Sequence, residues 1–169
     1  MAVRRLSAFA LDWLVVALWG GVLFGVVMLA TGGEPGRPCS PWSAQAVGVV
    51  AMTLPVVLYF AGCECSAMRA TLGKRVLRLV VTDAAQRRLP FAAALGRNAV
   101  KFVPWECGHL VAHQAMFAGD EGPAWWAWGA AIVAMGVPLW WVGALLLTGA
   151  MPYDRWTATQ VMATTNRGR

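Results

Sequence analysis

Residues 124–148 read AWWAWGAAIVAMGVPLWWVGALLLT, and none of these side chains is charged. As a helix with a rise of 1.5 Å per residue, this run would be about 37 Å long, whereas the hydrocarbon core of a bilayer is about 30 Å thick. The composition of the whole chain agrees: only 13% of the 169 residues are charged, against about 25% in soluble domains. The run therefore predicts a membrane-spanning helix.

Three further segments complete a predicted all-α, polytopic membrane domain that covers residues 1–169. Long apolar runs predict a first helix over about 6–30 and a second over about 44–66. A third is expected over about 91–118, kinked near Pro104, and the fourth extends over about 124–149. Polar residues make the third helix ambiguous between a full crossing and a re-entrant segment, and we favour about four transmembrane helices.

The segments outside the helices are basic or polar. Residues 69–90 hold six Lys and Arg against one acid, and residues 76–81 are partly β-branched before a turn-like stretch at 82–86. This pattern predicts a short β-hairpin within a basic cytoplasmic segment. Residues 150–169 are expected to form a polar cytoplasmic tail. With four spans and a cytoplasmic N-terminus, only Arg37 of the fourteen basic residues lies outside, as the positive-inside rule favours.

The positive charges adjoin hydrophobic runs instead of forming a soluble face, so their expected partners are anionic lipid headgroups and not nucleic acid. The equally open alternative is that these charges only anchor the topology of the helices. The headgroup candidates are Lys74, Arg75, Arg97 and Lys101. No arrangement of the Ser-His-Asp or Cys-His type stands out, so we expect no enzyme activity.

Ionisable residues within apolar helices require an explanation, because burying a charge in a membrane is costly. Asp12 follows Arg5 by seven residues, which places both on one helical face. One reading is a structural ion pair or a contact with another helix; the other is a carboxylate that binds a cation or a proton. Glu64, near the inner end of the second helix, and Glu106 with His109 are candidates for lining the same pathway.

Glu106, His109 and His113 have the spacing i, i+3 and i+7 and share one helical face. Such a set can bind zinc or another transition metal, which is the one cofactor that the pattern allows. Polar contacts between helices are the more common use of such residues, and the spacing does not separate the two readings.

Several motifs, in order along the chain, resemble the RDD family of bacterial membrane proteins. Residues 5–12 (RLSAFALD) are similar to its opening Arg and Asp, and residues 153–161 (YDRWTATQV) to its late Asp motif. Residues 70–81 (ATLGKRVLRLVV) resemble its central basic stretch. The resemblance implies a multi-pass protein of the bacterial inner membrane, with Arg5, Asp12 and Asp154 as the motif residues.

Transport has been proposed for this family, and monovalent cation/proton antiport is attributed to some members, while others are accessory domains. Our leading hypothesis is a small cation/proton exchanger in which Asp12 binds the ion and Arg5 and Asp154 act as gate or structural partners. Four helices enclose little lumen, so we expect a homo-oligomer. The alternatives are a non-transporting accessory or regulatory partner of another membrane complex, and a protein that binds a transition metal.

Overall fold

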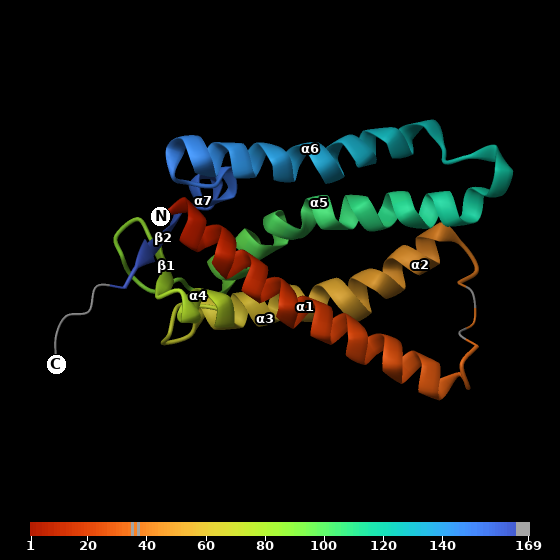
Figure 1. Ribbon diagram of the computed structural model, residues 1–169, viewed down its shortest axis with the longest axis horizontal. Helices are drawn as coiled ribbons and strands as arrows, with labels where there is room; N and C mark the ends of the chain where they lie inside the picture. Colours follow the sequence, from red (N-terminus) through yellow and green to blue (C-terminus); the bar gives the residue numbers. More distant parts are fainter. Residues whose placement is uncertain (35, 37, 165–169) are drawn as a thin grey trace. The chain divides into compact units, whose positions relative to one another are not determined.

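The computed structural model describes residues 1–34, 36 and 38–164, and long helices dominate it (Figure 1). The helical membrane class predicted from the sequence is confirmed, with a small two-stranded sheet added to it. In chain order the elements are α1 (Ala2–Ala30), α2 (Pro41–Gly48), the π-helix η1 (Val49–Thr53), α3 (Leu54–Cys65), α4 (Leu72–Val76), β1 (Leu79–Asp83), α5 (Phe91–Ala118), the 3-10 helix η2 (Gly119–Glu121), α6 (Trp125–Thr148), α7 (Pro152–Trp156) and β2 (Thr159–Ala163).

Three helical segments within the described residues are long and apolar enough to cross a membrane: α1, the continuous helix Pro41–Cys65, and α6. They agree with the first, second and fourth predicted helices. The predicted third helix is α5, whose 28 residues continue through Pro104. Because several charged residues interrupt α5, it does not reach the apolarity of the other three. The total of four spans and the kink near Pro104 stay predictions.

The second long helix changes its winding just before a proline. In a regular α-helix the N–H of residue 55 would donate to the carbonyl of Ala51, but Pro55 has no N–H. The π-helical turn Val49–Thr53 precedes this proline, and the Ala51 carbonyl accepts a hydrogen bond from Trp19 Nε1 at 3.1 Å. A side chain from another helix thus satisfies a backbone group that Pro55 leaves open.

The predicted local hairpin in the basic segment is wrong. β1 does form a strand, at residues 79–83, but it pairs antiparallel with β2, near the end of the chain, in the register Leu79↔Ala163 to Asp83↔Thr159 (Figure 1). After β1 the chain turns at Asp83, where the Gln86 N–H donates to the Asp83 carbonyl, and then continues into α5 instead of into a return strand. The predicted polar tail therefore contains two regular elements, α7 and β2.

The segments that precede the two strands have the same local structure. α4 and α7 each have five residues, and each is followed by a capping residue, then by a residue of positive φ (Arg78, 52°; Ala158, 48°), and then by a strand. Val81 and Val161, which are 80 residues apart, are paired at the centre of the ladder, and the remaining pairs are arranged symmetrically about them. The α4–β1 and α7–β2 segments are thus related by a local pseudo-twofold, and each follows a pair of long helices in the chain.

The chain divides into two compact units. Unit 1 comprises Met1–Val16, Val57–Lys101 and the described part of Trp141–Arg169; unit 2 comprises Ala17–Val56 and Phe102–Trp140. Both strands and both short helices belong to unit 1. Its core includes a cluster of buried apolar side chains from α3, β1, the loop before α5 and the start of α5: Ala61, Val81, Leu89 and Ala94.

Candidate functional site

Most of the buried charge of the protein is gathered in unit 1. Seven charged side chains from α1, α3, α4, α5 and α7 meet there, and none of the seven is exposed. We call them the buried charge network: Arg5, Asp12, Glu64, Lys74, Arg97, Lys101 and Asp154.

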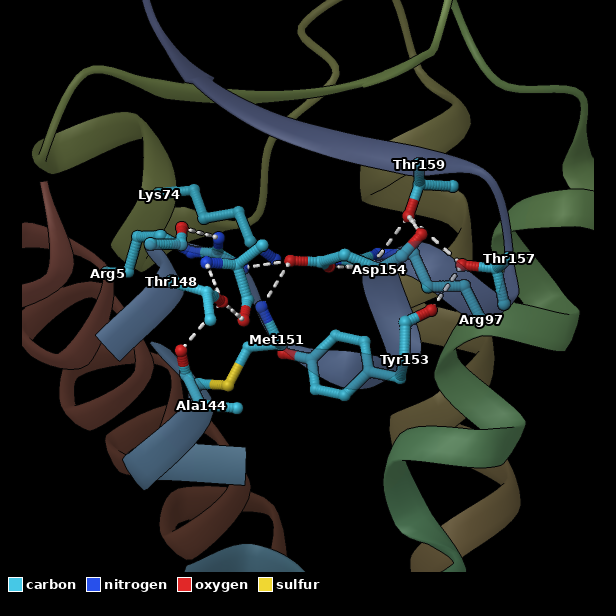
Figure 2. A network of polar contacts seen from close by, with 12 residues as sticks. Arg5, Lys74, Arg97, Ala144, Thr148, Met151, Tyr153, Asp154, Thr157 and Thr159 are labelled. Carbon is cyan, nitrogen blue, oxygen red and sulfur yellow. Dashed lines mark hydrogen bonds and ion pairs between the residues drawn. The ribbon is translucent and has the colours of Figure 1, made fainter. Parts of the chain in front are cut away.

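Asp154 lies between two arginines (Figure 2). It is the third residue of α7, which starts with Pro152, and its Oδ2 accepts from the backbone N–H of Met151 at 3.2 Å, as in a capping box. The same Oδ2 accepts from Arg5, and Oδ1 accepts from Arg97 Nη1 at 2.5 Å. Burial raises the pKa of Asp154, but the charges of Arg97 and Arg5 outweigh it and hold the pKa below its ordinary value.

Arg97 joins the two halves of the network. Its Nε donates to Glu64 at 3.2 Å, and its Nη1 donates to Asp154 and to Thr159 Oγ1, the latter at 3.0 Å. The guanidinium also lies 4.9 Å from the ring centroid of Tyr153 (Figure 2). Burial raises the pKa of Tyr153 to about 12, so this phenol stays neutral at neutral pH. A buried cation is tolerated here because carboxylates bind it on two sides.

Glu64 is completely buried at the end of α3. Its Oε1 accepts from Lys74 Nζ at 2.6 Å, and its Oε2 accepts from Arg97 and from Asn98 Nδ2, the latter at 2.9 Å. With the contacts of Asp154, these bonds form a chain of alternating charge that runs from Lys74 through Glu64, Arg97 and Asp154 to Arg5.

Asp12 is bound differently from the other two acids. Its Oδ2 accepts from the hydroxyl of Thr71 at 2.6 Å, and its Oδ1 accepts from the backbone N–H of Gly73 at 2.8 Å, so both donors are neutral. A Cβ at Gly73 would lie 2.2 Å from the carbonyl oxygen of Ala8 and 2.9 Å from Asp12 Oδ1. Glycine is therefore required for α4 to approach α1 this closely.

A small cavity of about 30 Å³ lies beside Asp12. Its charged lining residues are Arg5, Asp12, Lys74, Arg97 and Lys101. A second, open cavity of about 410 Å³ is lined by Arg5, Asp154 and Arg155 among others. Arg5 thus borders both cavities, and its ion-pair partner Asp154 borders the open one.

Unit 2 holds a separate polar cluster. Glu106 accepts from Gln45 Nε2 at 2.5 Å and from the Thr53 hydroxyl, and it lies 3.5 Å from His109 Nδ1. The rings of His109 and His113 are 6.3 Å apart. Within residues 1–34, 36 and 38–164, no group of three or more His, Cys, Asp and Glu side chains is placed to hold a metal ion. The metal-binding hypothesis for Glu106, His109 and His113 gains no support from this arrangement.

The sequence-predicted site residues therefore divide between the units. Arg5, Asp12, Glu64 and Asp154 come together in unit 1, while Glu106 and His109 belong to unit 2. Arg5 and Asp12 share a helical face, as expected, but each binds a different element.

Three of the four predicted headgroup ligands are placed elsewhere. Arg97 is 2% exposed, and Lys74 and Lys101 belong to the same network, because burying three carboxylates requires cations beside them. Arg75 is exposed and stays a headgroup candidate. Sequence reasoning also missed Thr71, Gly73 and Asn98 as partners of the acids. The adjacent polar residues Arg97 and Asn98, in a segment that is otherwise largely apolar, were a signal that could have revealed the partners of Glu64.

Comparison with known proteins gave one family. A family model described as the RDD family matches residues 1–157, which is nearly the whole chain and includes every member of the buried charge network. Neither the curated proteins nor the solved structures gave a match.

Proposed function

The chain belongs to the RDD family of membrane proteins, and from that premise we propose that it is a small transporter in which Asp12 carries an exchanged proton. One observation carries the proposal: Asp12 is a buried carboxylate that is held by neutral donors and borders a cavity. Ionisable residues at membrane depth mark ion and proton pathways in many transporters.

The other two buried acids are poorly suited to exchange a proton. Glu64 and Asp154 are each bound directly by two cations, so protonating either would break two buried salt bridges. Removing one partner of a buried ion pair costs about 3–5 kcal/mol. Asp12 accepts from a hydroxyl and an amide, and its protonation leaves the four salt bridges of the network intact.

A route to Asp12 follows from the two cavities. Arg5 and Asp154 line the open cavity, and Arg5 also lines the small cavity beside Asp12. We assign the Arg5–Asp154 ion pair the role of a gate, since withdrawing Arg5 would join the two spaces. The positive-inside pattern supports cytoplasmic termini in a bacterial inner membrane, so this gate would face the cytoplasm.

The ion that is exchanged for the proton is a separate question. The family resemblance implies a monovalent cation, but four basic side chains line the cavity at Asp12 and would repel one there. A cation would therefore bind outside this cavity. Assembly into a homo-oligomer would add a binding surface for the cation, which one small helical bundle does not provide.

The test is proton flux in proteoliposomes that carry the purified protein and a trapped pH dye. Pulses of Na⁺, K⁺ and Li⁺ are applied to the wild type, to Asp12→Asn and to Asp83→Asn. Asp83 is the matched control because it is an acid of unit 1 that pairs with the exposed Arg87. We expect flux in the wild type and in Asp83→Asn, and its loss in Asp12→Asn.

Undiminished flux in Asp12→Asn would refute the role of Asp12. If the folded, inserted wild type moved no protons under any pulse, transport itself would be refuted. The accessory-protein alternative would then lead, and it predicts a partner that co-purifies from native membranes.

A further inference from the structure

The open cavity of unit 1 has the size and the charge of a site for an anionic ligand. Its volume of about 410 Å³ lies in the range of about 300–1,000 Å³ that is common for small-molecule sites. Two arginines and one acid are among its lining residues: Arg5, Arg155 and Asp154. Asp154 is already bound by Arg5 and by Arg97, which is not part of the lining, so the excess positive charge at the cavity comes from Arg155.

Arg155 is suited to bind a phosphate. Its side chain is exposed, and it forms no ion pair with any acid of the described residues. A guanidinium stays protonated at physiological pH, and its planar fork of N–H donors matches the oxygens of a phosphate. Arg5 adds donors at the same cavity, because its bonds to the Gly149 carbonyl and to Asp154 use two of the five N–H groups of its guanidinium.

The cavity lies where a membrane-spanning helix ends. α6 ends at Thr148, and the next two residues, Gly149 and Ala150, line the cavity. Trp156, which follows Arg155, is 59% exposed, and tryptophan is enriched at the depth of the lipid headgroups. An opening at the end of a spanning helix lies at the same depth, so the phosphate of a lipid is the nearest source of a ligand.

We propose that the open cavity binds the phosphate of an anionic lipid headgroup, with Arg155 as its main ligand. Small side chains in the lining, among them Ala84, Ala150 and Ala158, leave room for the rest of the headgroup. The role that the sequence gave to Lys74, Arg97 and Lys101 thus passes to an arginine that sequence reasoning did not select. The proposal concerns binding alone and holds whether or not the protein exchanges protons.

The pseudo-twofold supplies a matched control for Arg155. Arg75 and Arg155 are each the fourth residue of a five-residue helix, and both are exposed, but Arg75 does not line the cavity. Arg155→Gln and Arg75→Gln therefore remove the same charge from equivalent positions. A difference between them reports on the cavity and not on the general attraction of a basic surface for anionic lipid.

A second pair of variants tests the space of the cavity without changing its charge. Ala84 and Ala85 are adjacent and both exposed, but only Ala84 lines the cavity. Ala84→Trp would place a large side chain in the space that the headgroup needs. Ala85→Trp places the same side chain one residue further along and is the control.

The experiment measures the thermal unfolding of the protein, purified in an uncharged detergent, during titration with dioleoylphosphatidylglycerol, diolein or glycerol phosphate at constant ionic strength. A ligand that binds only the folded state raises the Tm with saturation. Dioleoylphosphatidylglycerol should do so, diolein should not because it has no phosphate, and glycerol phosphate should act only at much higher concentration. We expect Arg155→Gln and Ala84→Trp to raise the apparent Kd for dioleoylphosphatidylglycerol about tenfold or more. Arg75→Gln and Ala85→Trp should leave this Kd within about twofold of the wild-type value.

Equal increases of the Kd in Arg155→Gln and Arg75→Gln would overturn the proposal, as would a wild-type Kd in Ala84→Trp. A diolein response as strong as that to dioleoylphosphatidylglycerol would show that acyl chains bind instead of phosphate. Saturation by glycerol phosphate at the same concentration would overturn a lipid as the ligand. If Arg155→Gln does not fold, the comparison of Ala84→Trp with Ala85→Trp decides. Proton flux in proteoliposomes has no bearing on these outcomes, so this proposal and the proposed function fail separately.

Discussion

Replacing Gly73 by alanine probes the close approach of α4 to α1 in unit 1. The new Cβ would lie 2.2 Å from the backbone oxygen of Ala8 and 2.9 Å from Asp12 Oδ1. A flexible side chain could rotate away from such a clash, but a backbone carbonyl of α1 cannot. Either α4 moves away from α1, or the helix start that binds Asp12 is distorted.

The expected loss of stability has two parts. Overpacking a close contact costs about 1–3 kcal/mol. Moving α4 also lengthens the hydrogen bond from the Gly73 N–H to the Asp12 carboxylate, now 2.8 Å, and a bond to a charged group contributes about 1.5–3 kcal/mol. We therefore expect Gly73→Ala to lower the free energy of unfolding by about 2.5–6 kcal/mol, a large part of a typical total of 5–15 kcal/mol.

Gly62→Ala is the matched control. Gly62 lies within α3 of the same unit, and a Cβ there would meet no atom within 4 Å. Alanine is the better helix former by about 1 kcal/mol, so this variant should be as stable as the wild type or more so. The assay is reversible denaturant unfolding in mixed micelles for both variants. A Gly73→Ala protein as stable as Gly62→Ala would refute the close approach of α4 to α1.

Two further predictions concern the C-terminal part of unit 1. The folded-state pKa of Asp154 lies below its ordinary 3.8, so the contribution of its ion pairs to stability is present above that pH and is lost as the pH falls through the folded-state pKa. In acid unfolding series, Asp154→Asn should therefore be less stable than the wild type at neutral pH, and its stability should depend less on pH below about 4. A variant whose stability falls with acid as steeply as that of the wild type would contradict the ion pairs. In the ladder, Val81→Cys with Val161→Cys should form an intramolecular disulfide on oxidation, detected by mass spectrometry, because these residues are direct partners; equal yield from Leu79→Cys with Val161→Cys would contradict the register.

Helix positions could be predicted from the sequence because they depend on local hydrophobicity. The predicted third helix, 91–118, has the same bounds as α5, and the fourth differs from α6 by one residue at each end. The strand partner could not be found in this way. Residues 159–163 lie about 80 positions from β1, and pairing over that distance depends on tertiary structure that no local pattern encodes.

The acids of the site were identified for a sound reason, but their partners were not. A buried charge stands out in an apolar helix, so Asp12 and Glu64 were visible in the sequence. Lys74 and Arg97 looked like interfacial cations because a sequence does not tell a cation that faces lipid headgroups from one that faces a buried carboxylate. Only the packing of α3, α4 and α5 in unit 1 brings Glu64 within hydrogen-bond distance of Lys74 and Arg97.

The pseudo-twofold of unit 1 indicates how the proposed gate would open without dismantling the network. Lys74 and Asp154 are both the third residue of their five-residue helices, so the two matching segments carry opposite charges at the same position. Glu64 and Arg97 connect these two charges, and the β1–β2 ladder connects the same two segments a second time. Arg5 is attached only at the end of this chain of charges. If Arg5 withdrew, Asp154 would still be held by Arg97 and by its own helix start, so the movement would cost one ion pair and the hydrogen bond from Arg5 Nη1 to the Gly149 carbonyl, and the buried centre would stay bound.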